Sequence, residues 1–141
     1  MAELHPQLQK DCLEVGRFPL CRLLLLRDAN YPWFVLVPDC DNISEIYQLS
    51  DADQQQLLRE STLLSRALAA AFTPDKLNIA ALGNMVPQLH LHHVVRYRSD
   101  PAWPAPVWGK VPATAYTAAA LSAVIAKLKE SLPIKEFESL I

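Results

Sequence analysis

Polar and apolar residues alternate over five positions of the chain, from Gln88 to His92. A period of two is typical of a half-buried β-strand, so Gln88, His90 and His92 are predicted to project from one face. Same-face neighbours on a strand lie roughly 7 Å apart, twice the rise per residue. Three of the four histidines fall within residues 90–93. Such a row of polar side chains is unsuited to a hydrophobic core and is a candidate functional site.

Two kinds of chemistry suit this spacing. Imidazole is a common zinc ligand, but His90 and His92 supply only two ligands, and no Cys or acidic residue close in sequence completes a tetrahedral set. Imidazole is also nucleophilic near neutral pH, so one ring could attack phosphorus while its neighbours orient it and manage protons. The alternative without chemistry is a polar strand edge that faces solvent.

The length of 141 residues predicts one domain, 1–141, that can bury a real core. A net charge of −2 gives no overall basic field, so neither nucleic acid nor a membrane surface is expected as a partner. The N-terminus carries no apolar signal region, and the longest apolar runs are far too short to span a bilayer. Three cysteines without CxxC spacing indicate reduced thiols, and hence a soluble cytoplasmic protein: Cys12, Cys21 and Cys40.

The order of the predicted elements indicates an α+β fold with a mainly antiparallel sheet and packed helices. We expect helices over 6–15, 46–49, 50–72 and about 114–132, and strands over 18–27, 33–37, 76–82 and 88–97. Gly16 is predicted to end the first helix, Ser50 to cap the long one, and Thr114 or Thr117 to begin the last. The proline-rich stretch 99–113 is expected to be an ordered loop, because Trp103 and Trp108 need somewhere to pack.

The run 88–94 resembles the signature of the histidine triad (HIT) superfamily, His-φ-His-φ-His-φ-φ with φ apolar. Here it reads Gln-φ-His-φ-His-His-Val. Asn84 lies just before the run, where HIT proteins often place a phosphate-binding Gln or Asn, and the strand ending at Pro38 is similar to one in the family. The tail up to Trp108 looks like that of a bacterial subgroup. The resemblance covers most of the chain and implies the HIT fold.

The resemblance also implies a nucleotide hydrolase or transferase that acts at the α-phosphorus of a nucleoside phosphoramidate or a dinucleoside polyphosphate, similar to the diadenosine polyphosphate hydrolases. His90, the middle member of the motif, would be the nucleophile and form a covalent nucleotidyl-histidine that water then cleaves. His92 would contact phosphoryl oxygens or the leaving group by charge and hydrogen bonding. This chemistry requires no metal, although a divalent ion could accompany the nucleotide. A homodimer is expected, as in similar HIT proteins.

Two departures from the motif bear on activity. Gln88 replaces the first histidine, and an amide can orient an imidazole but cannot carry a proton near neutral pH. Asn42 is the nearest match to a further family histidine, and it is equally a candidate helix cap. The alternative function is therefore a nucleotide-binding module with a degenerate, weakly active or inactive site.

Three more polar residues lie near the motif. Asn84 is the best candidate for a phosphate donor, although Asn after Gly is also ordinary turn chemistry. Asn78 is a weaker candidate, because a polar residue within a strand can simply face solvent. His93 is predicted by strand parity to lie on the opposite face from His90 and to be structural.

Overall fold

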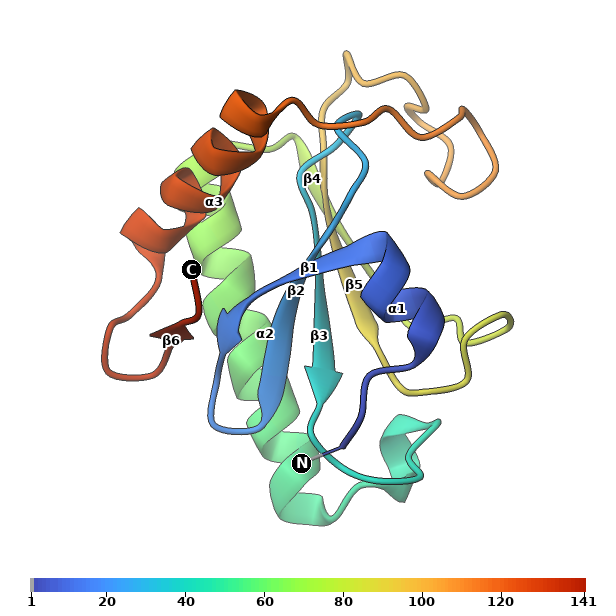
Figure 1. The fold of residues 1–141 in the computed structure, drawn as a ribbon, viewed down its shortest axis with the longest axis vertical. Coiled ribbons are helices and arrows are strands. Elements are labelled where there is room, and N and C mark those ends of the chain that lie inside the picture. Colours follow the sequence, from blue (N-terminus) through green and yellow to red (C-terminus); the bar gives the residue numbers. More distant parts are fainter. Residues whose placement is uncertain (1) are drawn as a thin grey trace.

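The computed structural model describes residues 2–141 and contains a six-stranded sheet with strand order β4-β5-β3-β2-β1-β6 (Figure 1). All neighbouring strands in it are antiparallel. The strands are β1 (Cys12–Arg17), β2 (Cys21–Leu26), β3 (Trp33–Pro38), β4 (Lys76–Ala80), β5 (Leu91–Arg96) and β6 (Glu138–Ser139). The predicted α+β fold with a mainly antiparallel sheet is confirmed.

Helices cover both faces of the sheet (Figure 1). The long helix α2 (Asp51–Phe72) and α3 (Ala118–Ser131) lie together on one side, and the short α1 (Pro6–Asp11) lies on the other. A single 3₁₀ turn, η1 (Ile46–Gln48), precedes α2. No helix within residues 2–141 is long and apolar enough to cross a membrane.

Alternation along the strands divides the apolar side chains between two clusters. One cluster joins the sheet to α2 and α3, and includes Phe34, Leu91 and Val95 from β3 and β5. The other joins the opposite face to α1 and the 97–109 loop, and includes Trp33 and Val94. Successive side chains of a strand point to opposite faces, so β5 contributes to both layers. This arrangement fixes where each histidine of the motif can lie.

Helix α2 begins where the sequence predicts. The Ser50 hydroxyl accepts a hydrogen bond from the Asp53 N–H at 3.1 Å, which satisfies one of the free donors at the helix start. Helix α3 is capped in the same way by Thr117 rather than Thr114, with the Ala120 N–H as donor. Within the predicted loop 99–113, Ala102 and Val107 are buried and pack into the second cluster.

The predicted helix over 6–15 is wrong, because it ends at Asp11 and the chain continues directly into β1. Apolar residues at 8, 12 and 15 have helical spacing, but β1 pairs with both β2 and β6. Gly16 therefore does not end a helix. It lies in β1 at a register shift, and a Cβ there would collide with the Phe137 ring and the Glu138 carbonyl. The two-residue β6 is too short to produce a sequence pattern.

The strand carrying the motif is shorter than predicted. It begins at Leu91 instead of residue 88, and β4 ends at Ala80 instead of residue 82. Residues 81–90 form a loop between the two strands. The Leu89 N–H donates to the Ile43 carbonyl at 2.9 Å, which holds the end of this loop against residues 40–44. Gln88 and His90 therefore precede the strand, and strand alternation alone does not set their directions.

Candidate functional site

A cavity of about 420 Å³ lies where the 81–90 loop enters β5. It brings together three of the predicted site residues, His90, His92 and Asn84. Apolar walls come from α1, the end of β2, β3 and two loops. The lining consists of Leu8, Asp11, Leu26, Trp33, Leu82, Gly83, Asn84, Met85, Val86, His90, His92 and Trp108.

The two histidines of the cavity are packed against each other. Their ring centroids lie 4.8 Å apart, with the ring planes nearly perpendicular at 72°. Each side chain is about nine-tenths buried, so only a small part of each ring is open to the cavity. This contact confirms that His90 and His92 lie on one face.

His90 is held by the backbone of Gln88. Its Nδ1 lies 2.7 Å from the Gln88 carbonyl oxygen. A carbonyl only accepts, so Nδ1 carries the proton and donates, and in the neutral ring Nε2 keeps its lone pair. No group within residues 2–141 makes a hydrogen bond to this Nε2. The arrangement leaves an unprotonated imidazole nitrogen available for attack on an electrophile.

His92 lies among aromatic rings. The Trp33 indole N–H donates to its Nδ1 at 3.0 Å, and the Trp108 ring packs edge-on with its centroid 5.1 Å away. Burial lowers the pKa of His92 to about 3, with smaller contributions from His90 and His93. His92 is therefore a neutral ring at physiological pH. The sequence pattern does not indicate either tryptophan as a site residue, although Trp33 has the parity that places it on this face.

His93 lies on the other face of β5, as predicted. It is fully buried against α2, where the Ser61 hydroxyl lies 2.7 Å from its Nε2. Its Nδ1 donates to the Leu91 carbonyl at 3.1 Å, so Nε2 accepts from Ser61. Burial lowers the pKa of His93 to about 4, although the Leu91 carbonyl opposes that shift. Both ring nitrogens are occupied, and the residue is structural.

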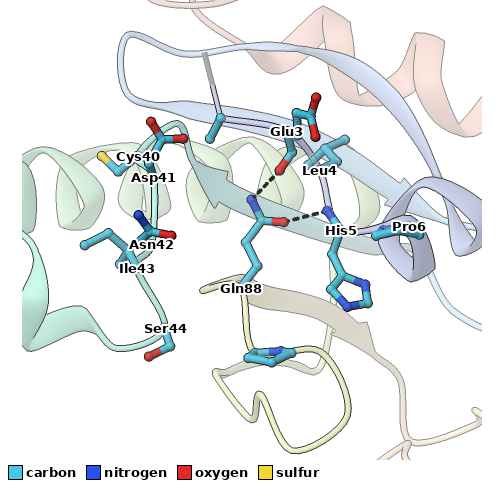
Figure 2. Close-up of a pocket in the computed structure, with 12 residues that line it drawn as sticks. Glu3, Leu4, His5, Pro6, Cys40, Asp41, Asn42, Ile43, Ser44 and Gln88 are labelled. Carbon is cyan, nitrogen blue, oxygen red and sulfur yellow. Dashed lines mark hydrogen bonds between the residues drawn. The ribbon is translucent and has the colours of Figure 1, made fainter.

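Gln88 does not place its side chain beside His90. Its Oε1 accepts from the His5 N–H at 2.7 Å, and its Nε2 donates to the Glu3 carbonyl at 3.0 Å (Figure 2). The amide thus pairs with the N-terminal segment as another backbone would. Gln88 lines a second cavity, of about 520 Å³, between that segment and residues 40–44.

The remaining predicted residues are dispersed. Asn42 lines the second cavity and has a φ of 56°, a left-handed conformation that Asn tolerates better than most residues. Asn78 lines neither of these two cavities, and its side-chain oxygen accepts from Arg96 at 2.8 Å. Arg96 is itself buried, and it pairs with Asp100 and donates to the Ala105 carbonyl. This arginine anchors the loop that carries Trp108.

The His90 cavity contains few charged groups. Asp11 is the one Asp, Glu, Lys or Arg side chain in its lining, and Asp11 is exposed. The neutral polar groups of the lining are the two imidazoles and the Asn84 amide, which is exposed like Asp11. Within residues 2–141 no group of three or more His, Cys, Asp or Glu side chains is arranged to hold a metal ion.

A pair of imidazoles at the start of β5, in an antiparallel α+β sheet, agrees with the family that the motif resembles. The family model described as HIT domain matches residues 7–99. The chain therefore belongs to the HIT domain family.

Solved structures support this membership over nearly the whole chain. A histidine triad protein from Marinobacter aquaeolei is 52% identical with a TM-score of 0.90, and covers 94% of this chain and 96% of its own. One from Bradyrhizobium japonicum is 44% identical with a TM-score of 0.91, covering 93% and 98%. One from Sinorhizobium meliloti is 37% identical with a TM-score of 0.90, covering 92% and 96%. No curated protein matches the chain.

Proposed function

We propose that this chain is a nucleotide hydrolase or transferase in which His90 attacks the α-phosphorus of a nucleotide. The observation that carries the proposal is the 2.7 Å bond from His90 Nδ1 to the Gln88 carbonyl, which leaves the Nε2 lone pair free. In the first step a bond forms between Nε2 and phosphorus while the bond to the leaving group breaks. In the second step water attacks phosphorus and His90 departs with its lone pair restored.

The cavity has the size and lining that a nucleoside monophosphate needs. Ligand sites are usually apolar cavities of roughly 300–1,000 Å³ with a few polar groups that fix orientation. Here Leu8, Leu26 and Trp33 supply the apolar walls for a base, while His92 and Asn84 supply polar groups near the nucleophile. Asn84 and His92 are the residues we expect to contact phosphoryl oxygens.

Charge favours a nucleoside phosphoramidate over a dinucleoside polyphosphate as substrate. Proteins commonly bind phosphate chains with Arg and Lys, and the lining of the His90 cavity contains neither. A phosphoramidate carries its charge on one phosphate group, which neutral donors can accommodate. A polyphosphate carries charge on several groups and would need a divalent cation to accompany it.

Intact-protein mass spectrometry after brief incubation with an adenosine phosphoramidate tests the proposal. We expect the mass to increase by one adenylate in the parent and not in His90→Ala. A parallel incubation with a diadenosine polyphosphate, with and without Mg²⁺, tests the substrate class, and we expect the smaller adduct yield there. His5→Ala is a control, because it removes a histidine that does not line the His90 cavity.

The alternative function predicts a different result. A degenerate nucleotide-binding module would bind adenosine monophosphate, form no adduct with either nucleotide, and bind equally well after His90→Ala. That result would overturn the enzyme proposal. The homodimer and the cytoplasmic location stay predictions, and sedimentation velocity on the purified chain tests the first.

A further inference from the structure

Trp33 and His92 meet because of strand register. In the pairing of β3 with β5, Trp33 lies opposite Val94 and Val35 lies opposite His92. Trp33 and His92 are therefore diagonal neighbours on one face, within reach of large side chains. The Trp33 N–H donates to His92 Nδ1 at 3.0 Å, and both side chains are more than nine-tenths buried.

This hydrogen bond decides which nitrogen of His92 carries the proton. An indole N–H can only donate, so Nδ1 of His92 must present its lone pair. A neutral imidazole has one N–H, which then lies on Nε2. Protonating Nδ1 would also bring two donors face to face, so the indole opposes the charged form as well as the other neutral form. Burial acts in the same direction on the pKa of this ring, which is lowered to about 3.

We propose that Trp33 is a positioning residue for the reaction, holding His92 in the Nε2–H form so that the neutral ring can donate to a phosphoryl oxygen or the leaving group. The inference rests on the proposed function. It assigns His92 the role of a neutral hydrogen-bond donor, in place of the positive charge expected from the sequence. Without the indole N–H, part of the His92 population would carry its proton on Nδ1. In that form the lone pair of His92 Nε2 would face the lone pair of the phosphoryl or leaving-group oxygen, and His92 could not donate to it.

The chain offers a matched control. Trp33 and Trp108 both pack edge-on against the His92 ring, with centroid distances of 5.7 Å and 5.1 Å. Only Trp33 donates a hydrogen bond to His92 among the described residues. Phenylalanine keeps an aromatic ring and removes the N–H at either position. Trp33→Phe thus removes the bond and a ring edge, and Trp108→Phe removes a ring edge alone.

The first readout is the ¹⁵N spectrum of labelled histidine near pH 7. We expect the parent to show an unprotonated Nδ1 and a protonated Nε2 at His92, and Trp108→Phe to show the same. Trp33→Phe should shift His92 toward a mixture of the two forms. A protonated Nδ1 in the parent would overturn the proposal without any variant, so a poorly folded Trp33→Phe does not leave it untested.

The second readout is kinetic. Removing a residue that orients a functional group typically lowers activity about 10–100-fold, so we expect Trp33→Phe to lower kcat by that factor. KM should change less than kcat, because phenylalanine keeps an apolar ring in the cavity wall. An unaltered kcat together with a parent-like His92 spectrum would overturn the proposal. A parent that forms no nucleotidyl adduct would instead refute the proposed function, while the spectrum still decides whether Trp33 sets the tautomer.

Discussion

His92 and His93 are adjacent on β5, yet they have opposite surroundings. Both are buried, and burial lowers the pKa of each, to about 3 and about 4. His93 has both ring nitrogens bonded, to Ser61 and to the Leu91 carbonyl. His92 has only Nδ1 bonded, to Trp33, and its Nε2 has no partner within residues 2–141.

The difference distinguishes a buried histidine that can bond to a ligand from one that cannot. Residue type, strand and burial are shared, so none of these separates the two residues. The separating feature is a ring nitrogen that the protein leaves unpaired beside a cavity, because that nitrogen can still bond to a ligand. The Nε2 of His92 is not among the buried atoms that lack a hydrogen-bond partner within residues 2–141, so it is open to the cavity and can bond to a ligand there.

Substitutions on the two faces of the sheet should differ most in their effect on turnover. Removing one preorganised donor to a developing charge typically lowers kcat about 10²–10³-fold, so we expect a loss of that size in His92→Asn. Steady-state kinetics on an adenosine phosphoramidate measures it. Equal kcat in His92→Asn and the parent would show that His92 makes no contact that matters in the transition state.

Ser61→Ala is the matching control on the other face. It leaves His93 Nε2 buried and unpaired, which should lower the free energy of unfolding by about 1–3 kcal/mol. The variant should keep the kcat of the parent, because Ser61 and His93 lie on the far side of the sheet from the cavity. Urea unfolding and the same kinetic assay separate the two effects.

Acid should destabilise the protein through both histidines. The unfolded chain binds protons with a pKa near the ordinary 6.5, whereas the folded pKa values are about 3 and about 4. Between these values the unfolded state binds more protons, so stability is full above about pH 6.5 and falls as the pH is lowered. The slope should approach about 1.4 kcal/mol per pH unit for each histidine.

Urea unfolding between pH 7 and pH 4.5 measures this slope while most carboxylates remain ionised. His92→Asn should remove about half of it, because it leaves His93 as the one ring of this pair whose pKa is lowered by folding. A parent whose unfolding free energy is constant from pH 6.5 to 4.5 would contradict the buried, neutral state of both rings.

The placement of His92 and His93 on opposite faces can be predicted from sequence, for a physical reason. Alternation along a strand is a local property, so the opposite faces of His92 and His93 can be predicted from residues 91–96 alone. The Ser50 cap is local in the same sense. The resemblance to the HIT motif likewise predicts His90 as the nucleophile, and its Nδ1 bonds to Gln88, two residues away in the chain.

The parts that sequence misses depend on distant partners. Gln88 was expected beside His90, but its amide bonds to residues 3 and 5, more than eighty positions away. The Trp33 bond to His92 depends on the register of two strands that are not consecutive in the chain. The apolar positions 8, 12 and 15 have helical spacing, but residues 12–14 pair with β2 and residues 16–17 with both β2 and β6, which makes 12–17 a strand.

Among substitutions within the motif, the smallest expected effect on turnover is that of Gln88→His, which restores the first histidine. If Gln88 were simply a weakened triad member, turnover should rise sharply. In the structure the Gln88 amide instead anchors the N-terminal segment, because its oxygen accepts from the His5 N–H and its nitrogen donates to the Glu3 carbonyl. The two nitrogens of an imidazole point in divergent directions and cannot replace both bonds.

We therefore expect Gln88→His to leave kcat close to that of the parent and to lower stability by about 0.5–1.5 kcal/mol for each bond lost. Gln88→Ala loses the same bonds without adding an imidazole, so both variants should unfold at similar urea concentrations and exchange the His5 amide proton faster. A large gain in kcat confined to Gln88→His would show that the added ring reaches the reacting phosphate. The first position of the motif would then carry proton transfer in this chain, and the anchoring of the N-terminal segment would be secondary to it.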